Sequence, residues 1–141
     1  METREATIAK MASREAVAGV MGLGYAGLPW ACAFAEAGFR TFGFDVDPIK
    51  IGHLQRGHSY IANPSSDLVG GLVQRGALIP TTSPEDLIKC DMVLICVPTP
   101  LGEDGGPDLG FVIGTAREVR LRLHRGQLVV LESTTYPGTP A

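Results

Sequence analysis

Residues 15–27 read EAVAGVMGLGYAG, and this stretch decides the fold. Its first part, residues 16–21, is apolar without polar alternation, which is typical of a parallel strand buried on both faces. The strand leads directly into Gly22-x-Gly24-x-x-Gly27 and then into a segment compatible with a helix. A strand, a glycine-rich turn and a helix in this order predict the first unit of a dinucleotide-binding domain.

The three glycines have separate predicted tasks. Gly22 allows a sharp turn, Gly24 lets a pyrophosphate approach bare backbone, and Gly27 lets the helix pack closely on the strand. The helix then directs its free N–H groups and the positive end of its dipole at the phosphates. Leu23 and Tyr25 lie in the same turn and belong to the predicted cofactor site, although Tyr25 either covers the phosphates or packs.

The next helix and strand add an acidic residue at the expected place. Residues 25–37 form a helix with Pro29 in its first turn and Gly38 as its C-cap, followed by a strand over residues 40–44. Asp45 ends that strand, where a carboxylate can accept both ribose hydroxyls of an adenosine. An acid at this position favours NAD over NADP, because a 2′-phosphate would meet like charge. The alternative is a solvated Asp that caps the helix at Asp47-Pro48.

The rest of the chain alternates helices with strands. We expect helices over residues 47–56, 65–74 and 108–124, a short helix beginning at Ser83, and strands over 78–82, 91–97 and 127–131. In the first of these helices, Ile49, Ile51 and Leu54 are the expected inward residues. Five strands alternating with helices predict an α/β fold, a Rossmann-like doubly wound parallel sheet in the order 3-2-1-4-5.

Composition limits the class of protein. The chain has 141 residues, 45% hydrophobic content and a net charge of −3, which indicate one globular domain over residues 15–141. No large basic cluster is present, so we expect neither nucleic acid nor membrane as a partner. Residues 1–14 are polar and contain no apolar signal segment, so we expect a flexible N-terminal tail on a cytoplasmic protein.

The cysteines and histidines suggest no metal site. Cys32, Cys90 and Cys96 do not have metal-ligand spacing, and an odd number of cysteines without a signal segment favours reduced thiols. Cys96 lies inside an apolar strand without a neighbouring base, so we interpret it as an inert buried thiol. We therefore expect no catalytic nucleophile in this chain.

Four further positions have open interpretations. Pro98 and Thr99 begin a long Pro- and Gly-rich loop after the fourth strand, where open α/β sheets bind ligands, and this place favours cofactor binding over a simple turn. Thr134 either ends the fifth strand or belongs to the site. Lys50, on a helix surface, fits a solvated side chain at least as well as a site residue.

The strand count also suggests what is missing. A complete dinucleotide-binding fold has six strands, so we expect this one to be truncated before its last strand. The fifth strand is then an apolar edge, which favours pairing with another chain. We therefore expect a homodimer or higher homo-oligomer, or poor solubility of the isolated piece.

Five motifs occur in order: GLGYAGLP (residues 22–29), GFDVD (43–47), CVPTPL (96–101), PDL (107–109) and ESTTYPGT (132–139). With them, the chain resembles the UDP-glucose/GDP-mannose dehydrogenase family from residue 16 to its end. The sequences of the third and fifth motifs are most similar to those of the family branch that oxidises UDP-N-acetylglucosamine or UDP-N-acetylmannosamine at C6.

The resemblance implies an NAD-dependent oxidation of a sugar C6 alcohol to a carboxylate by two hydride transfers through a cysteine-bound thioester. In the family, that cysteine, a lysine and the sugar-binding residues lie in later substrate and UDP-binding domains, so this chain alone should bind NAD without turnover. By the same resemblance, Lys50 lies near the adenosine ribose and Thr99 contacts the cofactor. Thr134 lies near the nicotinamide and helps to position a catalytic water.

Two other functions would use the same turn. A stand-alone nucleotide-binding module could regulate without chemistry. A methyltransferase has a similar glycine-rich turn and acid, but the third glycine, Pro29 and the loop at residues 98–100 disfavour it.

Overall fold

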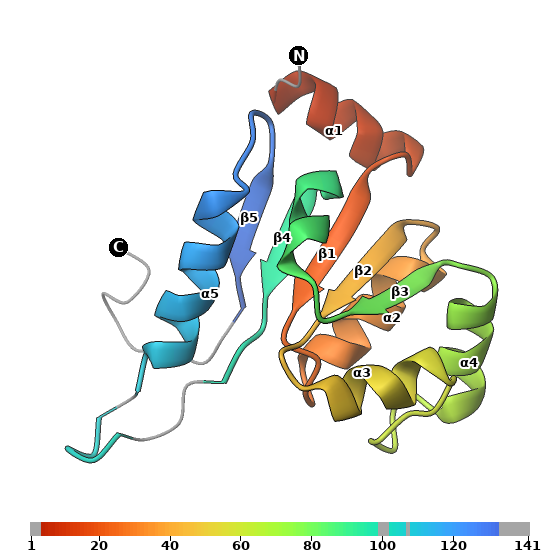
Figure 1. Cartoon of the computed structure of the whole chain (residues 1–141). Helices are drawn as coiled ribbons and strands as arrows, with labels where there is room; N and C mark the ends of the chain where they lie inside the picture. The colour runs from red at the N-terminus through yellow and green to blue at the C-terminus, as the bar shows by residue number, and fades with distance from the viewer. Residues whose placement is uncertain (1–3, 99–101, 107, 133–141) are drawn as a thin grey trace.

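A five-stranded parallel sheet in the order β3-β2-β1-β4-β5 forms the centre of the chain (Figure 1). The computed structural model describes residues 4–98, 102–106 and 108–132. Every neighbouring pair of strands is parallel, which confirms the predicted fold class and strand order. The strands are β1 (Val17–Met21), β2 (Arg40–Phe44), β3 (Leu78–Thr81), β4 (Met92–Ile95) and β5 (Leu128–Leu131).

Helices cover both faces of the sheet and enclose two apolar clusters. One cluster joins the sheet to α2 (Gly27–Glu36), α3 (Pro48–Gln55) and α4 (Ser66–Gln74). The other joins the opposite face to the 3-10 helix η1 (Pro84–Lys89) and to α5 (Gly110–Leu121). The predicted helices are thus present, with ends that differ from the expected ones by a few residues.

Local chemistry explains where these helices begin. The side chain of Asp47 accepts a hydrogen bond from the Ile49 N–H at the start of α3, and Ser65 does the same for Leu68 in α4. The expectation that Ile49 faces inward is wrong, since its side chain is 70% exposed. Ile51 and Leu54 are buried as expected, and Ile49 cannot share their face because residues two apart lie on opposite sides of a helix.

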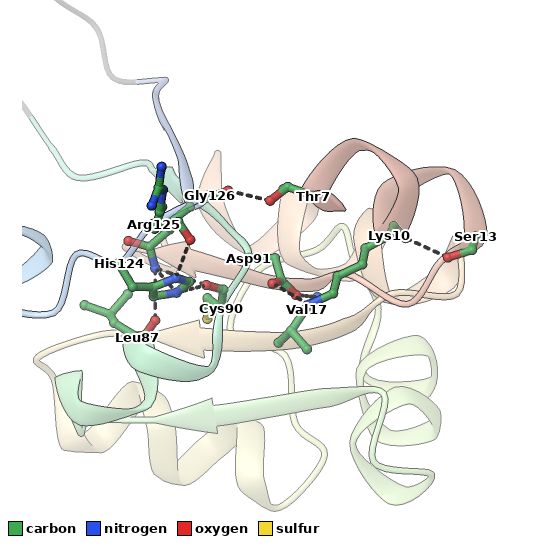
Figure 2. Close-up of polar contacts among 11 residues, drawn as sticks. Thr7, Lys10, Ser13, Val17, Leu87, Cys90, Asp91, His124, Arg125 and Gly126 are labelled. Atoms are coloured by element: carbon green, nitrogen blue, oxygen red, sulfur yellow. Dashed lines mark hydrogen bonds and ion pairs between the residues drawn. The ribbon is translucent and has the colours of Figure 1, made fainter. Parts of the chain in front are cut away.

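The predicted flexible N-terminal tail is also wrong, because residues 4–13 form helix α1 (Arg4–Ser13). The hydroxyl of Thr7 donates to the Gly126 carbonyl at 2.6 Å, and Lys10 Nζ lies 3.5 Å from Asp91 Oδ1 (Figure 2). Asp91 also accepts from the Val17 N–H at 2.8 Å. These contacts join segments far apart in the sequence, so the polar composition of the tail gave no local sign of them.

A second polar network fixes the turn that precedes β5 (Figure 2). His124 Nε2 lies 2.8 Å from the Cys90 carbonyl, and Gln127 Nε2 donates to the Leu87 carbonyl at 3.1 Å. Both contacts attach the start of β5 to η1 and to the segment before β4. His124 therefore attaches the turn before β5 to the segment before β4.

Strand β5 is an apolar edge of the described sheet. It pairs with β4, and its side chains Leu128, Val129 and Val130 are 46%, 38% and 40% exposed. Successive side chains on a strand point to opposite faces, so both faces of β5 are partly uncovered.

Within the part of the chain that the structure describes, no helix is long and apolar enough to cross a membrane.

We predict that the 141-residue chain associates with itself through β5, because an unpaired apolar edge is a template for another strand. Val130→Lys should shift the sedimentation profile at high concentration towards monomer, since an edge lysine opposes strand pairing. Ile88→Lys is the matched control, because Ile88 is 58% exposed on η1 and not on the edge strand. Monomeric wild-type chain at millimolar concentration would contradict this prediction.

Candidate functional site

A cavity of about 890 Å³ opens at the carboxyl ends of the strands. It lies at the point where the strand order reverses, since β1 pairs with β2 on one side and with β4 on the other. Open α/β sheets bind their ligands in this crevice. Its walls come from the turn after β1, the segment after β2, the segment after β4 and one side of α5. The residues that line it include Gly22, Leu23, Gly24, Tyr25, Asp45, Val46, Asp47, Lys50, Cys96, Val97, Pro98, Phe111, Gly114, Thr115 and Glu118.

The three glycines of the turn differ in the space around them. Gly22 has φ of +92°, and a Cβ on it would lie 2.6 Å from the Cys96 carbonyl oxygen. A Cβ on Gly27 would lie 1.6 Å from the Gly22 carbonyl oxygen, so α2 starts directly against the end of β1. Around Gly24, by contrast, a Cβ would meet no atom within 4 Å. Gly22 and Gly27 therefore make the turn possible, while Gly24 leaves open space on the cavity wall.

Asp45 is held in place by the same turn. Its Oδ2 accepts from the Leu23 N–H at 2.9 Å, and its Oδ1 accepts from the Asp47 N–H at 3.0 Å. A carboxylate offers about four acceptor positions, so each oxygen can take a further hydrogen bond from a hydroxyl. The helix cap is Asp47, whose Oδ1 accepts from the Ile49 N–H. Asp45 is thus an oriented acceptor on the cavity wall and is not the cap of α3.

The structure places most of the predicted site residues together. Leu23 has a fully buried side chain, whereas Tyr25 is 86% exposed beside the cavity. Lys50 and Pro98 also line the cavity, and Gly27 lies behind the turn in contact with Gly22. Thr99 and Thr134 lie outside the residues that the structure describes.

Sequence reasoning missed the wall that α5 provides. Phe111, Gly114, Thr115 and Glu118 line the cavity from one face of this helix, and Glu132 lines it after β5. Spacings of three, four and seven residues are the signature of one helix face, so the pattern was visible in the sequence. Nothing local, however, distinguished a face towards a cavity from a face towards the sheet.

The three thiols Cys32, Cys90 and Cys96 are protonated at neutral pH, and only Cys96 lines the cavity. Burial, with a smaller contribution from Glu132, raises the pKa of Cys96 to about 11. Burial likewise raises the pKa of Cys32 to about 11 and that of Cys90 to about 12. Because the thiolate is the nucleophilic form, these thiols have the character of structural residues.

No group of three or more His, Cys, Asp or Glu side chains that could hold a metal ion occurs in residues 4–98, 102–106 and 108–132.

The sequence of the chain matches those of known proteins. Residues 16–141 match the model of the UDP-glucose/GDP-mannose dehydrogenase family, NAD binding domain. The UDP-N-acetyl-D-mannosamine dehydrogenase of Escherichia coli K12 is 38% identical over 121 residues, which are 85% of this chain and 28% of that protein. The NDP-N-acetyl-D-galactosaminuronic acid dehydrogenase of Ralstonia nicotianae is 40% identical over 120 residues, 84% of this chain and 28% of that protein.

A solved structure agrees with this similarity. The UDP-D-ManNAc dehydrogenase from Pyrococcus horikoshii has a TM-score of 0.82 and 37% identity, over 86% of this chain and 29% of that one. The chain therefore spans less than a third of the length of the relatives that it matches.

The different space around the glycines predicts different effects of alanine. Gly24→Ala should change the free energy of unfolding by less than about 1 kcal/mol, because the methyl group enters open space. It should weaken NAD binding at least about tenfold, because the methyl group would occupy the place that the sequence motif predicts for a phosphate. Gly27→Ala should destabilise the fold by about 3 kcal/mol or more, because its Cβ overlaps the Gly22 carbonyl.

Urea unfolding and NAD titration of both variants check this prediction. Gly71→Ala is the matched control, since a Cβ on Gly71 in α4 also meets nothing within 4 Å and Gly71 does not line the cavity. Normal NAD affinity in Gly24→Ala would show that the phosphates do not approach this backbone.

Proposed function

The chain belongs to the UDP-glucose/GDP-mannose dehydrogenase family as its NAD-binding domain, and we propose that the whole protein oxidises the C6 alcohol of a UDP-sugar to a carboxylate. The reaction consumes the alcohol, one water and two NAD⁺, and it yields the carboxylate, two NADH and three protons. NAD is the cofactor of this domain. Bound NAD supplies the hydride acceptor, and the described residues supply its binding site.

One observation gives the main support for the cofactor site. The open backbone at Gly24 and the oriented carboxylate of Asp45 line the same cavity. We assign the pyrophosphate to the backbone of the turn at Gly22, Leu23 and Gly24, and the adenosine ribose to Asp45. The N-terminal end of α2 adds a positive dipole near the phosphates.

The remaining assigned cofactor contacts lie around Gly24 and Asp45. We assign Tyr25 to the phosphates and Lys50 to the neighbourhood of the adenosine ribose. Pro98 and Thr99, which follow β4 in the sequence, are assigned to the cofactor as well. Thr134 is assigned to the nicotinamide, where it would help to position a water for the reaction. The family resemblance supports the roles of Thr99 and Thr134.

Charge supports NAD over NADP in this cavity. Asp45 and Asp47 both line it beside the end of β2, and a 2′-phosphate on the ribose would meet both carboxylates. Lys50 is a single cation on the same wall. The site therefore favours the ribose with free hydroxyls.

The substrate and the remaining domains are part of the proposal. The Escherichia coli and Ralstonia nicotianae relatives act, by their names, on N-acetylated nucleotide sugars, so we propose a UDP-N-acetylhexosamine substrate. We further propose that the substrate domain and the UDP-binding domain lie beyond residue 141. The 141-residue chain would then bind NAD without turnover.

Asp45→Ala should weaken NAD binding at least about tenfold, because the ribose loses its charged acceptor and the turn loses its contact at Leu23. Calorimetric titration with NAD, with NADP as a comparison, measures both affinity and preference. Asp67→Ala removes an exposed carboxylate from the first turn of α4 and should leave affinity unchanged. Equal binding of NAD and NADP by the wild-type chain would contradict the assigned role of Asp45.

The activity itself needs the longest natural polypeptide that contains these residues. With saturating NAD and a UDP-N-acetylhexosamine, absorbance at the NADH band should report two NADH for each sugar oxidised. One NADH for each sugar would contradict complete oxidation to the carboxylate. A protein that binds NAD yet oxidises no UDP-sugar would instead support the stand-alone regulatory module.

A further inference from the structure

We infer that Tyr60 is a positioning residue for the cofactor-binding turn and that it acts through the Leu23 carbonyl. Tyr60 comes from the connection between α3 and α4, far from the turn in the sequence. Its hydroxyl donates a hydrogen bond to the carbonyl oxygen of Leu23. This inference rests on the proposed binding of NAD at the turn, and it adds a residue that does not line the cavity.

The hydrogen bond of Tyr60 controls the peptide group between Leu23 and Gly24. A trans peptide is planar, and its C=O and N–H groups point in opposite directions. The bond that holds the Leu23 carbonyl therefore also fixes the direction of the Gly24 N–H. Gly24 lies on the cavity wall with open space around it, so its N–H belongs to the surface offered to a phosphate.

The preceding peptide group is fixed in the same way from the other side. The N–H of Leu23 donates to Asp45 Oδ2 at 2.9 Å, and the Gly22 carbonyl at the opposite end of this peptide faces Gly27. The side chain of Leu23 is fully buried in the apolar cluster under α2. Tyr60 and Asp45 thus hold the two successive peptide planes of the turn.

The surroundings of Tyr60 keep its hydroxyl a donor. Burial raises the pKa of the phenol, and the carboxylates of Asp45 and Asp47 raise it further. The ring packs against the apolar cluster, and Lys50 Nζ lies 5.9 Å from the ring centroid. The ring therefore places the Lys50 cation near the cavity, in addition to the role of the hydroxyl.

Tyr60→Phe separates these two roles, because it retains the ring and removes only the hydroxyl. The Leu23 carbonyl loses its partner, and the Leu23–Gly24 peptide gains rotational freedom. We expect the Kd for NAD and for ADP to rise about three- to tenfold, as for the loss of one hydrogen bond. The Kd for adenosine should change less than about twofold, because adenosine reaches Asp45 without contacting the Gly24 N–H.

Thr7→Val provides a matched control. It removes a hydroxyl that also donates to a distant backbone carbonyl, that of Gly126, and it lies on α1 beyond the opposite ends of the strands. Calorimetric titration of the 141-residue wild-type chain and both variants should show weaker NAD and ADP binding in Tyr60→Phe alone. Equal losses for adenosine and ADP, or unchanged affinity for NAD in folded Tyr60→Phe, would overturn the inference.

A measurement without nucleotide separates this inference from the proposed function. In two-dimensional amide NMR spectra of the free proteins, Tyr60→Phe should shift the Gly24 amide and accelerate its exchange with solvent, whereas Thr7→Val should leave both unchanged. An unchanged Gly24 amide in Tyr60→Phe overturns the positioning role, whatever the NAD affinity. A changed amide in a chain that binds no NAD would support the control of the turn by Tyr60 and refute the cofactor site.

Discussion

The approach of helix α2 to the end of strand β1 is the constraint on which the rest of the site depends. The Gly22 carbonyl oxygen occupies the place where a Cβ on Gly27 would lie, so only glycine permits this contact. The contact allows α2 to begin immediately after the turn, with its N-terminus at the crevice between β1 and β4. It also leaves Leu23 between Asp45 and Tyr60, which hold its N–H and its carbonyl.

The carboxyl and amino ends of the strands have different surroundings. At the carboxyl ends of the strands, acceptors and open backbone surround a cavity. At the amino ends, α1, Asp91 and the turn before β5 form closed polar contacts, including those of Thr7 and His124 (Figure 2). The proposed binding site and the contacts that attach α1 therefore lie at opposite ends of the strands, so a change at α1 can serve as a control for a change at the turn.

Much of the fold was predictable because its signals are local. The apolar runs of β1 and β4, the glycines of the turn, and the caps at Asp47 and Ser65 are each defined by a few neighbouring residues. Most of what the sequence did not reveal concerns contacts between distant segments: α1 contacts Gly126 and Asp91, and Tyr60 contacts the turn at the Leu23 carbonyl. In the site, Asp45 and the glycines followed from spacing, while the α5 wall required knowledge of which side of the sheet that helix covers.

The central claim is that the turn after β1 and Asp45 bind the pyrophosphate and the adenosine ribose of NAD. A crystal structure of the chain grown with NAD tests it most directly. The account predicts the pyrophosphate within hydrogen-bonding distance of the backbone at residues 22–24 and both ribose hydroxyls on the Asp45 carboxylate. A dinucleotide bound elsewhere, or one whose phosphates lie away from Gly24, would contradict the account.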